Sequence, residues 1–246
     1  MDADIKCFVC KRLVPKKNLV REHITPRFLD KENPSGTVKV CRECSAFESQ
    51  KQYLEYKTYS ISKNKDPYKS FLEAMYELEI LLGVSLPDTK LKSTMAKISF
   101  ATAITAMETY LSDTFINRVA SNDVLTRRCV ETDPEFKNRK LDLSDIFKRK
   151  ESLSQEVRNY LVDILFHNLA KVKMMYKSVL HIEFPKDLGV LYKAIETRHD
   201  IVHRGGKNKS GAIKPVMRDE VISLIVSLKS FTKCIEEQLS RSQASD

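Results

Sequence analysis

The sequence predicts a mainly α-helical protein with a small metal-binding module at its N-terminus. Six glycines and eight prolines in 246 residues leave room for long uninterrupted helices. From about residue 90 onward apolar residues recur at helical spacing, as in Ile104, Met107 and Leu111. Four of the six cysteines form two CxxC pairs near the start of the chain.

The cysteine pairs, Cys7 with Cys10 and Cys41 with Cys44, have the spacing of a tetrahedral zinc site. Each pair can present two thiolates to one ion, and four thiolates complete the coordination shell. Because so short a segment has few core residues, we expect zinc to be needed for residues 1–48 to fold. The predicted zinc is structural and takes no part in catalysis.

Between the cysteine pairs lies REHITPRFL, residues 21–29, which with the flanking cysteines resembles an HNH-type treble-clef nuclease module. In that family the histidine at the position of His23 lies on a strand and activates water beside a divalent metal. The chain departs from the family pattern at two positions. No asparagine occurs in SGTVKV before the second pair, and Ser45, a poor magnesium ligand, stands where histidine or asparagine is expected. We interpret the module as a degenerate HNH fold that binds nucleic acid or a partner, with His23 as a remnant.

We expect three parts in the chain: the zinc module over residues 1–48, a helical connector over 49–89 and a helical bundle over 90–243. Residues 121–150 are charged and are predicted to be irregular, with one short helix. The pattern also predicts a last helix, and a basic loop before it.

Ser152 and Gln155 have the spacing of a capping box, in which two side chains satisfy the free N–H groups at a helix start. This pattern predicts a helix that begins near Ser152. The apolar periodicity after it predicts that the same helix continues to about Leu180.

The segment ETRHDIVHRGG, residues 196–206, combines a permanent cation with a group that can transfer protons. Arg198 offers a planar fork that fits phosphate oxygens, and His203 can take or give a proton near neutral pH. Phosphodiester cleavage needs both functions. The preceding residues have a helical pattern, and Gly205 with Gly206 can end that helix, because glycine accepts the left-handed conformation.

Residues five apart on an ideal helix point about 140° away from each other. Arg198 and His203 of one chain would therefore converge poorly on one phosphate. This geometry favours a composite site at the interface of a dimer.

The string RHDIVHRGG resembles the motif of HEPN-domain ribonucleases, and residues 101–115, ATAITAMETYLSDTF, resemble the first long helix of that family. The resemblance implies an all-α HEPN bundle, a homodimer with facing motifs, and metal-independent cleavage of RNA. His203 would handle the 2′-hydroxyl proton and Arg198 would steady the phosphoryl charge, which leaves a 2′,3′-cyclic phosphate. No cofactor is implied for catalysis.

The same resemblance implies roles for neighbouring residues. His199 occupies the polar position after the arginine and would assist. Glu108 or Asp113 on the first bundle helix would orient the arginine by a carboxylate pair, although both acids also fit an exposed surface. Arg204 and Lys207 would grasp the RNA backbone. Such domains often serve as toxins or phage-defence effectors, so an antitoxin or regulator is a further expected partner.

Several alternatives use the same residues. HDIVH places His199 and His203 on one helix face, as in zinc proteases, but Asp200 stands where that motif needs glutamate. In a purely structural alternative, Arg198 pairs with an acid and His199 packs in the core. The chain would also fit a non-catalytic nucleic-acid or protein-binding adaptor, or a DNA nuclease that uses His23.

The formal net charge of +9 favours a polyanionic partner. No apolar run reaches the length of a membrane span, and MDADIKCFVC has no apolar signal core. We therefore expect a cytoplasmic protein that does not contact a membrane.

Overall fold

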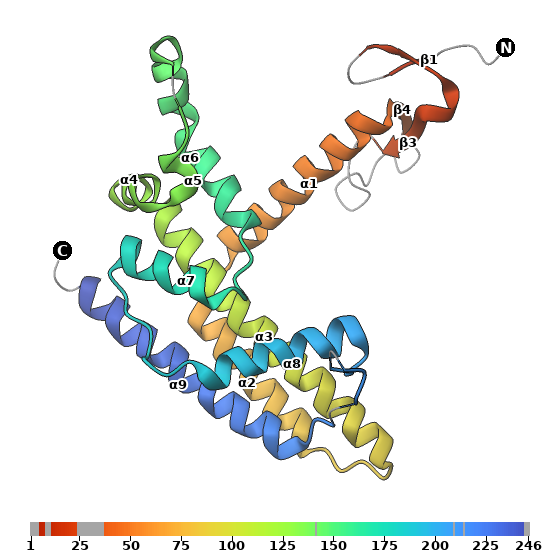
Figure 1. Ribbon diagram of the computed structural model, residues 1–246, viewed down its shortest axis with the longest axis vertical. Coiled ribbons are helices and arrows are strands. Elements are labelled where there is room, and N and C mark those ends of the chain that lie inside the picture. The colour runs from red at the N-terminus through yellow and green to blue at the C-terminus, as the bar shows by residue number, and fades with distance from the viewer. Residues whose placement is uncertain are drawn as a thin grey trace. The chain divides into compact units, whose positions relative to one another are not determined.

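The computed structural model of the protein is mainly helical, as the sequence predicts (Figure 1). It forms two compact units, Met1–Tyr59 and Ser60–Asp246. No helix in the described part of the chain is long and apolar enough to cross a membrane. The structure describes residues 5–7, 11–23, 37–140, 142–208, 210–213 and 215–243.

The N-terminal unit consists of two small antiparallel hairpins and most of a long helix. Its elements are β1 (Ile5–Lys6), β2 (Leu13–Val14), the 3-10 turn η1 (Lys16–Asn18), β3 (Leu19–His23), β4 (Thr37–Cys41) and α1 (Arg42–Lys63). β1 pairs with β2, and β3 pairs with β4. The second register aligns Leu19 with Cys41, so α1 begins directly after the paired strand.

The second unit is a helical bundle built around one long helix, α3. Its elements are α2 (Pro67–Gly83), α3 (Thr89–Ala120), α4 (Asp123–Thr132), α5 (Pro134–Lys137), η2 (Leu143–Asp145), α6 (Ile146–Asp163), α7 (Leu169–Met175), the π-turn η3 (Tyr176–Leu180), α8 (Gly189–Arg204) and α9 (Arg218–Gln243). The helices α2, α4, α6, α8 and α9 all pack against α3. The motif helix α8 therefore lies directly on the first bundle helix.

The core of the bundle forms along the apolar stripe of α3. Ile104, Met107, Leu111 and Phe115 expose no surface. Tyr176 is also fully buried, with its ring centroid 5.3 Å from that of Phe115, and its hydroxyl donates to the Leu111 carbonyl at 2.7 Å. Burial raises the pKa of Tyr176 well above its ordinary value, so this hydroxyl remains a donor.

The end of α1 and the helix α2 belong to the bundle. The Nδ2 group of Asn117 on α3 donates to the carbonyls of Ile61 and Asn64, both at 3.0 Å. α2 packs along α3 and α9, burying Phe71 and Met75. The expected connector over residues 49–89 thus includes a helix that contributes core side chains.

The capping-box prediction at Ser152 is wrong. α6 begins at Ile146, and Ser152 lies inside the helix, where its hydroxyl donates back to the Arg149 carbonyl at 3.3 Å. A serine inside a helix can satisfy its hydroxyl on the preceding turn, so the spacing to Gln155 did not mark a helix start.

The predicted continuation of this helix to Leu180 is also wrong. α6 ends at Asp163, and Asn168 caps a new helix by accepting the Lys171 N–H at 3.2 Å. The region expected to be largely irregular, residues 121–150, contains the helices α4 and α5 and the start of α6.

Candidate functional site

The motif helix α8 ends where the sequence predicts. Leu191 and Ala194 are buried against the bundle. Gly205 adopts the left-handed conformation with φ of 63°, and Gly206 follows with φ of 85°. Both glycine N–H groups donate to the carbonyl of Asp200, which satisfies an acceptor at the helix end. The chain therefore leaves α8 sharply after Arg204.

Arg198 reaches from α8 to the carboxylate of Glu108 on α3. The shortest separation, Nη2 to Oε2, is 3.9 Å, which is an ion pair rather than a hydrogen bond. The side chains are 21% and 16% exposed. Arg198 Nε and Glu108 Oε1 are buried without a hydrogen-bond partner among the described residues. The pair thus retains unused donors and acceptors in a partly dehydrated position.

His167 completes this cluster around Glu108. Its Nδ1 lies 4.0 Å from Glu108 Oε1. Burial raises the pKa of Glu108, while the neighbouring Arg198 and His167 act in the opposite direction. No pattern in the sequence connects His167 with the motif, because the contact exists only through the packing of distant segments.

His199 and His203 lie one turn apart at the exposed end of α8. Their ring centroids are 4.7 Å apart and the rings are inclined by 46°. Both side chains are exposed. The purely structural alternative predicts that Arg198 pairs with an acid and that His199 packs in the core. Arg198 does pair with an acid, whereas His199 is exposed.

Further cations gather where α8 ends. Arg204 is paired with Asp200 at 2.9 Å, and Lys207 is exposed in the following loop. Lys97 of α3 also approaches this point, since a Cβ placed on Gly206 would lie 3.5 Å from its Nζ. Sequence reasoning missed Lys97, which lies far from the motif along the chain.

Asp113, the second acid expected near the motif arginine, makes contacts elsewhere. Its carboxylate accepts from Asn64 Nδ2 at 2.8 Å and from the Ser112 hydroxyl at 3.0 Å. The bond to Asn64 joins α3 to the turn between α1 and α2. Of the two candidate acids, Glu108 is the one beside Arg198.

Three of the four predicted zinc ligands come together in the N-terminal unit. The Sγ atoms of Cys7, Cys41 and Cys44 lie within 4.8 Å of one another. Cys41 ends β4 and Cys44 lies in the first turn of α1. Cys10 lies outside the described residues. Three thiol groups this close are compatible with zinc, which takes tetrahedral thiolate sites.

Hydrogen bonds connect the backbone of Cys7 to that of Lys11 and Arg12. The Cys7 N–H donates to the Arg12 carbonyl at 2.9 Å, and the Lys11 N–H donates to the Cys7 carbonyl at 3.1 Å. Lys11 adopts a left-handed conformation, with φ of 61°, which turns the chain back into β2. The turn thereby directs Cys7 toward the second pair, whose Cys41 N–H lies 3.3 Å from Cys7 Sγ.

The HNH-like residue His23 ends β3, where its backbone pairs with Thr37. Its side chain and residues 24–36 lie outside the described residues, whereas Ser45, one of the two departures from the HNH pattern, lies in α1. The strand position expected for this histidine is present, and its chemistry stays a prediction.

Comparisons of this chain with protein-family models, with curated proteins and with solved structures found no match.

Proposed function

We propose that this protein is a metal-independent endoribonuclease of the HEPN type, with Arg198 and His203 as its catalytic residues. The observation that carries the proposal is the environment of the Arg198 side chain. Glu108 holds it on α8, one of its donors is unused, and the exposed His203 lies on the same helix. An oriented cation and an accessible imidazole are the two groups that RNA cleavage by its own 2′-hydroxyl requires.

In the proposed reaction, His203 accepts the proton of the 2′-hydroxyl, whose oxygen attacks the adjacent phosphorus. The bond to the 5′-oxygen breaks, and that oxygen receives a proton from the protonated imidazole of His199. A 2′,3′-cyclic phosphate and a 5′-hydroxyl result. Arg198 stabilises the charge on the non-bridging oxygens as it builds up. Arg204 and Lys207 hold neighbouring phosphates.

The site is proposed to be shared between two copies of the chain. Side chains five positions apart on one helix diverge by about 140°, so Arg198 of one protomer and His203 of its partner meet the substrate more easily than two groups of one protomer. A cytoplasmic toxin or phage-defence effector, restrained by an antitoxin or regulator, is the biological setting that the family resemblance suggests.

We also propose that Cys7, Cys10, Cys41 and Cys44 bind one zinc ion. Its role is structural: four thiolates close the coordination shell and leave no position for water or substrate. The N-terminal unit then supplies a nucleic-acid or partner-binding surface rather than a second nuclease.

The test is incubation of the purified protein with total RNA in a chelator, followed by analysis of the fragment ends. We expect cyclic-phosphate ends, and a loss of activity of about 10²- to 10⁴-fold in His203→Ala. Arg198→Ala should also be inactive. The control is Arg127→Ala, because Arg127 is an exposed arginine of α4 that pairs only with Glu131 in the described part of the chain.

Mixing the two inactive variants tests the shared site. If Arg198 and His203 act across an interface, Arg198→Ala and His203→Ala chains should restore activity when they are refolded together. RNA left intact by the wild-type protein would contradict the proposal and favour the adaptor. Magnesium-dependent DNA nicking that is lost in His23→Ala would identify the HNH module as the nuclease.

A further inference from the structure

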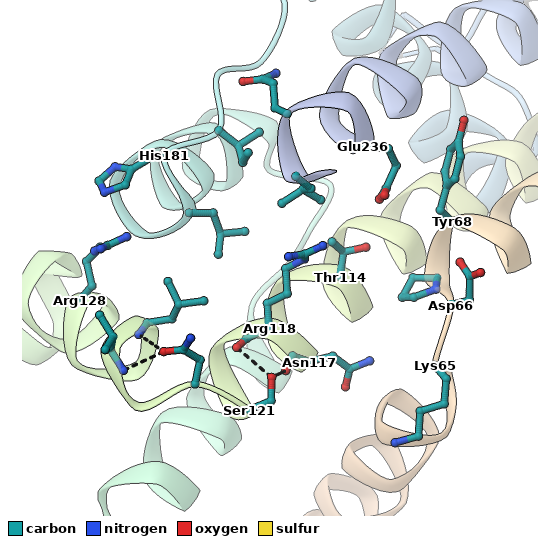
Figure 2. Close-up of a pocket in the computed structure, with 18 residues that line it drawn as sticks. Lys65, Asp66, Tyr68, Thr114, Asn117, Arg118, Ser121, Arg128, His181 and Glu236 are labelled. Carbon is teal, nitrogen blue, oxygen red and sulfur yellow. Dashed lines mark hydrogen bonds between the residues drawn. The ribbon is translucent and has the colours of Figure 1, made fainter. Parts of the chain in front are cut away.

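A large cavity, lined by both polar and apolar side chains, lies within the helical unit and shares no residue with the site at the end of α8. Its volume is about 1030 Å³, at the upper limit of what small-molecule sites use. It is enclosed by the turn between α1 and α2, by α3, α4 and α9, and by the segment after η3 (Figure 2).

The cavity collects cationic side chains from separate segments. Arg118 comes from the last turn of α3, Arg128 from α4 and Lys65 from the turn before α2. His181 comes from the segment after η3. Figure 2 shows Arg128 and His181 at one side of the cavity, Lys65 with Asp66 at the other, and Arg118 between them. Packing of distant elements thus places basic side chains on both sides of the cavity.

Arg118 is the central observation. It is half-buried, yet its guanidinium donates no hydrogen bond and forms no ion pair in the described part of the chain. None of its nitrogens is among the buried side-chain atoms that lack a hydrogen-bond partner, so its donors remain accessible from the cavity. An anion in the cavity would satisfy these donors.

The two carboxylates of the cavity are already engaged. Asp66 caps α2 by accepting the Lys69 N–H at 2.9 Å. Glu236 accepts the hydroxyl of the buried Tyr110 at 2.8 Å. Neither carboxylate is bonded to Arg118. With histidine neutral, three cations and two carboxylates line the cavity, which leaves one net positive charge that a ligand can neutralise.

The segment that contacts Arg128 and precedes His181 has an unusual backbone conformation. η3 is a π-turn, and such turns are frequent at functional sites. Arg128 Nη1 donates to its Val179 carbonyl at 2.7 Å, which leaves the other guanidinium donors available. His181 follows in the left-handed conformation with φ of 58°, which is strained for a non-glycine residue.

We propose that this cavity binds the phosphate group of a small anionic metabolite, with Arg118 and Arg128 donating to its oxygens. Guanidinium groups bind phosphate through paired, charge-assisted hydrogen bonds. His181 and Lys65 lie on either side as additional donors. Free polyphosphate and the phosphates of a nucleotide share this chemistry, and Tyr68 at the Asp66 side offers a half-buried ring to a nucleoside.

The test is calorimetric titration of the full chain with pyrophosphate, ATP and adenosine. We expect pyrophosphate and ATP to bind and adenosine, which lacks phosphate, not to bind. Arg118→Gln should weaken binding about 10- to 100-fold, the range for lost hydrogen bonds to a charged group. This variant is decisive because Arg128→Ala would also remove the bond to Val179. The control is Arg127→Ala, the exposed neighbour of Arg128.

The outcomes separate the sources and the sites. Equal affinity for pyrophosphate and ATP would assign the cavity to free polyphosphate, and tighter binding of ATP would add recognition of the nucleoside; both support the proposal. Absence of binding at millimolar concentration, or unchanged affinity in Arg118→Gln, would overturn it. Affinity lost in His203→Ala would place the ligand at α8 instead and would also overturn it, whether or not the protein cleaves RNA.

Discussion

The two units of this protein differ in what stabilises them. In the described part of the N-terminal unit the buried cluster consists of Cys7 and Cys41, with Val14, Leu19 and Cys44 packed against them. The helical unit buries aliphatic and aromatic side chains from α2, α3 and each of the later long helices. The comparison indicates that the first unit depends on its thiols, whereas the second folds through its hydrophobic core.

Removal of zinc should have the largest effect and should be confined to one unit. Structural zinc contributes about 10–16 kcal/mol of apparent binding free energy in zinc-finger peptides. We expect a chelator, or Cys41→Ser, to abolish the protection of β3 and β4 against hydrogen exchange. The helices from α2 to α9 should keep their protection.

The matched control is Cys234→Ser, a half-buried cysteine of α9 outside the cysteine cluster. Elemental analysis should find one zinc per chain in this variant and none in Cys41→Ser. Equal zinc content in both variants would remove the proposed metal site. Burial raises the pKa of the remaining cysteine, Cys129, to about 12, so that thiol stays protonated and is not expected to bind metal.

A cavity in the core should have the next largest effect, on the other unit. Phe115 exposes no surface, and Phe115→Ala is expected to lower the free energy of unfolding of the bundle by about 3–5 kcal/mol. Circular dichroism during urea denaturation measures this change, and the zinc content should not alter. Phe147→Ala is the control, because Phe147 is 79% exposed. Equal losses in the two variants would show that Phe115 does not support the core.

The sequence predicted the features that depend on local pattern. The mainly helical class, the apolar stripe of α3 and the end of α8 at Gly205 are confirmed. The closeness of Cys7, Cys41 and Cys44 is also confirmed. The helical features follow from periodicity and from the conformational freedom of glycine, which act over a few residues. The cysteine cluster follows from the spacing within each CxxC pair, although the two pairs lie more than 30 residues apart.

The wrong predictions concern segments in which a residue type can either cap a helix or occupy another position. Asn122 caps α4 by accepting two N–H groups, and Asp133 with Pro134 starts α5, within a segment expected to be largely irregular. Ser152 had the spacing of a cap but lies inside α6. Each residue type serves both caps and other positions, so tertiary packing decides which signal is used.

The sequence predicted only part of the candidate site, because some of its contacts join segments that are distant in sequence. The motif residues Arg198 and His203 lie close in sequence, whereas His167 reaches Glu108 only because the segment after α6 packs beside α3. The cavity that Arg118 and Arg128 line was not predicted at all, since its residues come from five separate segments. No periodicity or spacing connects them.

A smaller effect is expected where α8 ends. Gly205 has φ of 63°, a conformation that costs other L-residues about 1–2 kcal/mol. Gly205→Ala should therefore lower the stability of the helical unit by about this amount in urea denaturation. The control is Gly83→Ala, because Gly83 ends α2 with no positive φ and no atom within 4 Å of an added Cβ. Equal stability changes in the two variants would contradict the strained helix end.

The smallest expected effect is a change in pH dependence at Glu108, which again concerns only the helical unit. Burial raises the pKa of Glu108 in the folded state above its ordinary value of 4.5. The folded chain therefore binds more protons than the unfolded chain above this pH, and the contribution of Glu108 to stability falls as pH rises through the folded pKa. Below pH 4.5 that contribution is fully present.

Glu108→Gln does not titrate, so the wild-type free energy of unfolding, minus that of the variant, should be constant at low pH and decrease above it. Urea denaturation over a pH series measures the difference, with the exposed Glu151→Gln as control. A difference that rises with pH would mean that Arg198 and His167 outweigh burial, and that the unit holds its motif arginine with an ordinary ionised carboxylate.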